Sequence, residues 1–141
     1  MDILAIKEQI ADAVAWYSID GCKSQDIETI LEKQGEIVGL SYTLAEAVAV
    51  DQRCYIVAYN QRKLAEAKKY VELKSERKLS VADADRLAIV YGAGDRLSET
   101  KAEIDYYSNR TVLLQLNKVL DAIAQRISWL KKEKEYTYLS N

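Results

Sequence analysis

The sequence predicts an all-α protein built from a few long helices. The chain has no proline and only five glycines in 141 residues, so it offers few points at which a helix must stop. Apolar residues recur at helical steps of three, four and seven along most of its length. Hydrophobic residues make up 49% and charged residues 30%, which suits a helical core with a solvated surface.

The expected helices cover residues 2–17, 24–38, 43–73, 81–91 and 95–136. Asp20-Gly21 is a turn signal that ends the first helix, and Ser24 is a candidate N-cap for the second. Thr43 and Glu46 have the spacing of a capping box, which predicts a new helix or a bend in one long helix. We favour a bend or a short break.

Two further signals place the later helices. Ser80 is a candidate N-cap for a short helix, and Gly92 with Gly94 marks the clearest break in the chain. The helix over 43–73 carries an apolar stripe of Ala47, Val50, Cys54, Val57, Leu64 and Val71. The final helix carries a stripe with alternating steps of three and four, the seam spacing of helices that pack side by side: Leu113, Leu116, Leu120, Ile123, Ile127 and Leu130.

The expected helix lengths predict an extended arrangement of one domain, residues 1–141. Forty residues of helix span about 60 Å, which exceeds the diameter of a compact globule of this size. We therefore expect an elongated bundle or hairpin of long helices. Such hairpins bury more apolar surface by assembling, so we also expect a homo-oligomer with the stripe of the final helix as its seam.

The composition excludes several classes of chemistry. The chain has no histidine, the usual general base near neutral pH, and Cys22 and Cys54 have no histidine partner for nucleophilic catalysis or a zinc site. The glycines near residue 93 lack the lysine of a phosphate-binding loop. We expect no enzyme, no metal and no cofactor. No apolar run is long enough for a membrane span, so we expect a cytoplasmic protein.

The charges are unevenly distributed along the chain. Residues 1–51 contain ten acids and three bases, a net charge of −7, whereas residues 52–141 contain twelve acids and seventeen bases, a net charge of +5. The basic part could face an anionic partner. Alternatively, the acidic part of one subunit could pack on the basic part of another. The composition does not choose between the two.

Two basic segments with interleaved aromatic residues are candidates for nucleic-acid binding. Basic side chains neutralise phosphates, and flat rings stack on bases. The alternative reading is an ordinary solvated helix face with aromatics at the edge of the core. The candidate residues of the first segment are Arg62, Lys63, Lys68, Lys69, Tyr70, Lys74 and Arg77, and those of the second are Arg126, Trp129, Lys131 and Lys132.

The plan of the chain resembles the UvsY-type recombination mediators of T-even phages. The resemblance lies in Leu120-Asp121-Ala122-Ile123 followed by Arg126 in a long terminal helix, and in Lys68-Lys69-Tyr70 at the end of an earlier one, which begins after Ile19-Asp20. The string Lys101–Ser108 is also similar to one in that family. In the family it lies further from the terminal motif, so the two strings cannot be aligned together.

This resemblance implies a phage-encoded homo-oligomer that binds single-stranded DNA and promotes recombinase loading in the host cytoplasm. It implies contacts with a recombinase and a single-strand-binding protein, and it places Lys68 and Lys69 at the DNA. The alternatives are a helical protein-binding inhibitor or adaptor, such as a phage anti-defence protein, and a structural assembly component. For an inhibitor, the acidic residues of the first half would form the active surface: Asp26, Glu28, Glu32, Glu36 and Glu46.

Overall fold

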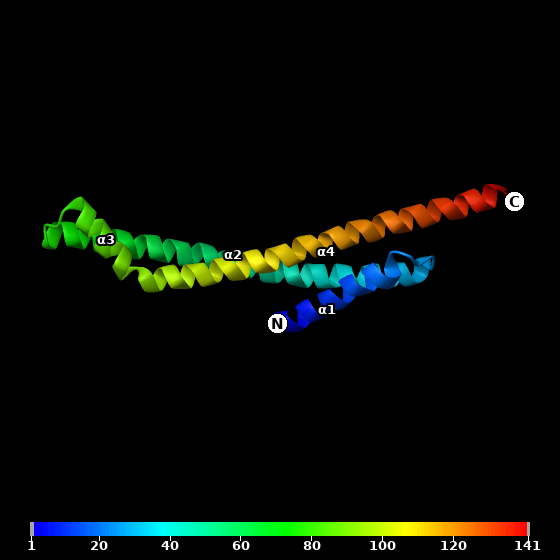
Figure 1. Cartoon of the computed structure of the whole chain (residues 1–141), viewed down its shortest axis with the longest axis horizontal. Helices are drawn as coiled ribbons and strands as arrows, with labels where there is room; N and C mark the ends of the chain where they lie inside the picture. The colour runs from blue at the N-terminus through cyan, green and yellow to red at the C-terminus, as the bar shows by residue number, and fades with distance from the viewer. Residues whose placement is uncertain (1, 141) are drawn as a thin grey trace. The chain divides into compact units, whose positions relative to one another are not determined.

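The described part of the protein consists of helices joined by short turns. The computed structural model describes residues 2–140 and has no strand within them. The predicted all-α class is confirmed. The elements are α1 (Ile3–Trp16), a π-helical turn (Tyr17–Gly21), α2 (Ile27–Glu76), α3 (Val81–Tyr91) and α4 (Ala93–Ser140) (Figure 1).

The first predicted helix continues beyond its expected end as the π-helical turn. Asp2 caps α1, because its carboxylate accepts hydrogen bonds from the backbone N–H groups of Leu4 at 3.0 Å and Ala5 at 3.3 Å. The expected turn at Asp20-Gly21 is the end of the π-helix instead. A Cβ atom on Gly21 would lie 2.8 Å from the ring of Trp16, so glycine lets this wider turn close over the indole.

α2 is one helix of 50 residues, so the separate helices expected over 24–38 and 43–73 are wrong, and the alternative of one long helix through Thr43 holds. The Thr43 hydroxyl donates to the Gly39 carbonyl at 3.1 Å, a bond within the helix and not a cap. Ile37 and Leu44 are fully buried on either side of this glycine, and their packing keeps the segment helical. Tertiary burial here outweighs a local capping signal.

The N-cap of α2 lies two residues beyond the predicted cap. The Asp26 carboxylate accepts hydrogen bonds from the backbone N–H of Glu28 at 3.1 Å and from that of Thr29 at 3.4 Å. The Thr29 hydroxyl also donates to it at 2.7 Å, and this bond is the main reason that the pKa of Asp26 lies below its usual value. Asp26, and not Ser24, therefore caps the helix.

α3 begins and ends where the sequence predicts. The Ser80 hydroxyl accepts a hydrogen bond from the Asp83 backbone N–H at 3.2 Å, as expected of the N-cap. A single residue, Gly92, then separates α3 from α4. Gly92 is buried, and a Cβ atom there would lie 2.8 Å from the Cγ atom of Glu66. Glycine thus allows α2 to approach the junction of α3 and α4.

The helices form two compact units, and the expected single domain over residues 1–141 stays a prediction. Unit 1 comprises the residues up to Ala47 together with those from Asn109 onward, and unit 2 comprises Val48–Ser108. In unit 1, three helical segments share an apolar core. α2 and α4 each bury residues at steps of seven, and α1 adds two isoleucines. These core residues are Ile30, Ile37 and Leu44, Leu116, Ile123 and Leu130, and Ile6 and Ile10.

The interior of unit 2 is polar in comparison. α2 and α4 run antiparallel in this unit, as the contacts of Tyr55 with Tyr106 and of Arg62 with Glu99 show. Arg62 is buried inside this pair of helices. The large apolar side chains of the same helices lie mostly outside, including all members of the predicted stripe except Ala47: Val50, Cys54, Val57, Leu64 and Val71.

The core of unit 1 makes a direct prediction about stability. Leu116 is fully buried, so Leu116→Ala should lower the free energy of unfolding by about 2–5 kcal/mol, through lost burial and the cavity it leaves. Leu4→Ala removes the same atoms from a side chain that is 68% exposed and should change stability by less than about 0.5 kcal/mol. Thermal and urea unfolding measure both. Equal effects of the two substitutions would contradict the assigned core.

Candidate binding surfaces

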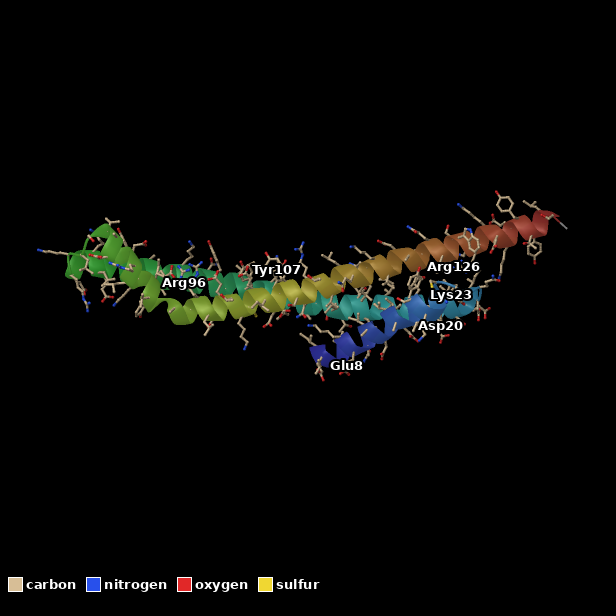
Figure 2. All side chains as sticks on the ribbon, viewed as in Figure 1. Glu8, Asp20, Lys23, Arg96, Tyr107 and Arg126 are labelled. Atoms are coloured by element: carbon tan, nitrogen blue, oxygen red, sulfur yellow. The ribbon has the colours of Figure 1, made fainter. Side chains whose placement is uncertain are left out.

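An ion-pair network lies inside unit 2 and fixes the place of Arg62. Its guanidinium donates to Glu99 through Nε and Nη2 and to Glu66 through Nη1, the last at 3.2 Å. Arg96 donates to the other oxygen of Glu66 at 2.7 Å (Figure 2). The hydrogen bond with Glu99 is the main reason that the pKa of Arg62 is raised. Arg62, predicted to contact nucleic acid, is only 8% exposed and already holds two carboxylates.

A tyrosine cluster adjoins this network and was not singled out in the sequence. The rings of Tyr55 and Tyr106 stack with centroids 6.2 Å apart, and Tyr107 lies 4.9 Å from Tyr106. Burial, and then the nearby charge of Glu103, raises the pKa of Tyr55. The cluster supplies the apolar contact between α2 and α4 that the charged residues do not. The pair of adjacent tyrosines was visible in the sequence, but its alignment with Tyr55 depends on the helix register.

The remaining bases of the first predicted segment divide into bound and exposed side chains. Lys69 pairs with Glu72 at 3.1 Å and lies over the Tyr91 ring, 4.8 Å from its centroid. Lys74 donates to the Leu79 carbonyl at 3.0 Å and so closes the end of α2. These two lysines hold the helix end in place. Exposed bases outside these contacts are Lys63, Lys68 and Arg77.

The exposed bases do not share one face. Lys63 and Tyr70 line a groove of about 460 Å³ between α2 and α3, whose other wall includes Val81 and Ile89. Lys68 lies about 140° from Lys63 around the axis of α2, because successive residues turn by about 100°. Arg77 follows Glu76, the last residue of α2, and so lies beyond the helix.

The second predicted segment belongs to unit 1. Arg126 donates to the Ser24 carbonyl from Nη2 at 2.8 Å and from Nε at 3.2 Å, and its guanidinium lies 4.8 Å from the centroid of the Trp129 ring (Figure 2). It thus secures the segment that leads into α2. Lys131 and Lys132 are exposed on α4. Of the predicted basic residues here, these two remain accessible to a ligand.

The predicted oligomer seam lies within a single chain. Leu116, Ile123, Ile127 and Leu130 are buried in unit 1, and Leu113 and Leu120 are half-buried. One chain thus already covers the stripe. A role for it between subunits stays a prediction.

The outer face of α2 in unit 2 carries an apolar row with basic residues beside it. The row consists of Val50, Val57, Leu64 and Val71, which follow one another at steps of seven and are 46–62% exposed. Arg53 and Lys68 are exposed on the same side of the helix. Arg62 and Glu66, inside the pair of helices, lie on the opposite side.

The outer face of α2 in unit 1 carries an acidic row, which includes three of the acids expected to form an inhibitor surface: Glu28, Glu32 and Glu46. Its members are all exposed, and Tyr42 is 72% exposed. A Cβ atom on Gly35 or Gly39 would meet none of the described residues within 4 Å apart from the adjoining turns of α2, yet glycine inside a helix costs about 1 kcal/mol relative to alanine. No packing within the chain therefore accounts for these glycines. The acidic row comprises Glu28, Glu32, Gly35, Gly39, Tyr42 and Glu46.

Among the described residues there is neither a cluster suited to a metal ion nor a helix suited to a membrane span. Residues 2–140 contain no group of three or more cysteine, aspartate or glutamate side chains placed to hold a metal ion. None of the described helices combines the length and apolar character of a membrane span. Comparison with protein-family models, characterised proteins and solved structures finds no match to the chain.

The ion-pair network predicts a contrast between two arginines. Arg62→Ala leaves Glu66 and Glu99 largely buried without their main donor, so the melting temperature should fall clearly. Arg86 pairs with Asp83 at the surface, where solvent screens the charges, and Arg86→Ala should have little effect on it. Thermal unfolding followed by circular dichroism gives the melting temperatures of the two variants. If Arg62→Ala melts like the wild type, the network does not hold α2 and α4 together.

Proposed function

We propose that the protein is a non-enzymatic, cytoplasmic recombination mediator of the phage type that binds single-stranded DNA and promotes recombinase loading. The observation that carries the proposal is the groove between α2 and α3, where exposed Lys63 and the ring of Tyr70 lie on one wall. A basic side chain beside a flat ring suits a strand whose phosphates need neutralising and whose bases stack. Arg77, just beyond α2, adds an exposed positive charge in the same unit.

Local clustering, and not net charge, has to provide the attraction. Residues 48–108 contain eleven bases and ten acids, which is almost neutral. Several of those acids are engaged in ion pairs inside the unit, among them Glu66 and Glu99. The groove itself also includes Asp85, so we expect a modest affinity with a strong dependence on salt.

The partner proteins in this proposal come from the resemblance to UvsY-type mediators. A recombinase and a single-strand-binding protein would bind the assembled protein, and the DNA would lie across several copies. Lys131 and Lys132 of unit 1 supply a second set of exposed charges for the strand.

A titration with labelled single-stranded DNA at two salt concentrations tests the DNA-binding step. The double variant Lys63→Gln, Arg77→Gln should bind all sequences more weakly, because phosphate contacts carry no base information. If both side chains contact phosphates, the slope of log affinity against log salt should decrease by roughly 1.4, about 0.7 for each contact. Fluorescence anisotropy provides the measurement.

The matched control is Lys101→Gln, Lys118→Gln, which removes two exposed charges away from the groove. It should bind like the wild type. If the wild-type protein does not bind DNA at low salt, the mediator proposal is refuted. If both double variants weaken DNA binding equally, the groove is not the DNA-binding site.

The exposed apolar row favours a second candidate, a helical adaptor, inhibitor or assembly component that binds protein through α2. Apolar side chains repeated at steps of seven are typical of a surface that another helix covers. Under this alternative the protein should bind its partner equally well at low and moderate salt and should not bind DNA.

A further inference from the structure

The apolar row of α2 lies entirely within unit 2. Its four members, Val50, Val57, Leu64 and Val71, belong to residues 48–108 and are 46–62% exposed. The two ends of the row are 21 residues apart, or about 32 Å along the helix axis. Apolar side chains aligned over such a length are typical of a surface that another helix covers.

Two bases flank the row and carry charges that the described residues do not neutralise. Arg53 and Lys68 lie within about 60° of the row around the axis of α2. No ion pair within residues 2–140 involves either of them. Glu72 is exposed nearby, but it pairs with Lys69 at 3.1 Å. The row therefore has an uncompensated positive charge near each end.

A groove beside Leu64 widens this surface. It has a volume of about 640 Å³, with Leu64 and Lys68 on the α2 side and Tyr91, the last residue of α3, on the other. The Nζ atom of Lys69 lies 4.8 Å from the centroid of the Tyr91 ring and holds the ring there. Asp95 also lines the groove, but it lies in the first turn of α4, where the helix dipole favours a carboxylate. The groove can receive a side chain of a helix that lies along the row.

The charges disfavour a second copy of the same face as the occupant. In a parallel pair, Arg53 would face Arg53 and Lys68 would face Lys68. In an antiparallel pair that overlaps the whole row, Val50 faces Val71 and Arg53 faces Lys68. Like charges directly opposed are unfavourable, so both pairings are disfavoured. The face is complementary to an occupant that brings acidic groups.

Two other kinds of anionic occupant match the row less well. Nucleic-acid bases stack on aromatic rings, and the row contains none. A helix that lies on a membrane surface typically inserts tryptophan, phenylalanine or leucine, whereas three of the four members of the row are valine. A protein helix with both apolar and acidic positions matches the apolar steps and the flanking charges together.

We propose that unit 2 binds an acidic amphipathic helix of a partner protein along the apolar row. The partner helix packs its apolar side chains on the row and places a carboxylate near each of the two flanking bases. These carboxylates are about 22 Å apart, since the two bases are 15 residues apart in α2. The inference rests on the protein-binding candidate above and names its partner. It is separate from DNA binding, because Lys63 and Tyr70 lie more than about 90° from the middle of the row around α2.

Two synthetic helical peptides of about 21 residues, the length of the row, test the proposal on the full chain. Both carry leucine at the positions that face the row. One carries glutamate at the flanking positions, and the other carries lysine there. In fluorescence anisotropy, the wild-type protein should bind the glutamate peptide at least about tenfold more tightly than the lysine peptide. If it prefers the lysine peptide, the row is still a protein-binding surface, but the acidic partner is wrong.

Charge reversal at the two flanking bases should reverse this preference. The double variant Arg53→Glu, Lys68→Glu should bind the lysine peptide more tightly than the glutamate peptide. The matched control Lys63→Glu, Lys101→Glu makes the same change at exposed bases of unit 2 outside the row and should keep the wild-type preference. If both double variants reverse the preference, the overall charge and not the row selects the peptide, which contradicts the proposal.

Removal of apolar side chains tests the row itself. Val57→Gln, Leu64→Gln should weaken binding of the glutamate peptide at least about tenfold, because the buried apolar contact is lost. The control Leu97→Gln, Ile104→Gln removes apolar side chains that are 73% and 59% exposed elsewhere in unit 2, and it should bind like the wild type. Circular dichroism should show the same helical content for both double variants, since all four side chains are exposed.

Three outcomes would overturn the proposal. The first is a wild-type protein that does not bind the glutamate peptide at about 1 mM, where even a weak complex forms. The second is peptide binding that Val57→Gln, Leu64→Gln leaves unchanged. The third is self-association in light scattering, or binding to vesicles of phosphatidylserine and phosphatidylcholine, that the same variant abolishes, because another occupant then covers the row.

A titration of the same variant with single-stranded DNA keeps the two functions apart. Val57→Gln, Leu64→Gln should bind DNA as the wild type does, because its substitutions lie outside the groove that holds Lys63 and Tyr70. Failure of peptide binding with intact DNA binding refutes the acidic partner alone. Peptide binding in a protein that does not bind DNA refutes the mediator alone.

Discussion

Arg62 lies between Glu66 and Glu99 inside the α2–α4 pair, and this ion-pair network makes the interior of unit 2 polar. A buried guanidinium is tolerated only when carboxylates surround it, so the facing positions of α4 and the next turn of α2 have to be acidic. The sites that would otherwise hold leucine or isoleucine are thereby occupied by ion pairs. The apolar side chains of the same helices, such as Leu64 and Val71, are left on the outside.

In unit 1, by contrast, α2 and α4 pack through apolar residues and a third helix, α1, adds to the core. Ile30, Ile37 and Leu44 of α2 are buried by α1 and α4 together, at the same seven-residue step that the apolar row follows in unit 2. In unit 2 the third helix, α3, has only 11 residues, and its buried residues are Ala84 and Ala88. The difference between the units therefore lies in what covers the helices and not in their periodicity.

This explains how far the sequence can predict the structure. The helix start at Ser80 and the apolar stripe of α4 with Ile123 and Ile127 were predictable, since a cap and a periodic stripe are local patterns. The break at Thr43 was not, because packing around Leu44 overrides a cap. A step of seven looks the same whether the chain itself or another molecule covers the stripe. The stripe through Val57 was therefore indistinguishable from a core until the helices were placed.

The candidate site was less predictable than the fold, for a related reason. Whether a base is available depends on what lies opposite it in space, and Arg126 binds a carbonyl 102 residues away in the chain. Such an arginine differs from Lys63 or Lys131 only in the hydrogen-bond partners that the fold places beside it, and the sequence does not reveal those partners. The exposed glycines of α2 illustrate the same limit on prediction from the sequence. A glycine inside a helix costs about 1 kcal/mol relative to alanine, and no contact among residues 2–140 accounts for that cost at Gly35 or Gly39.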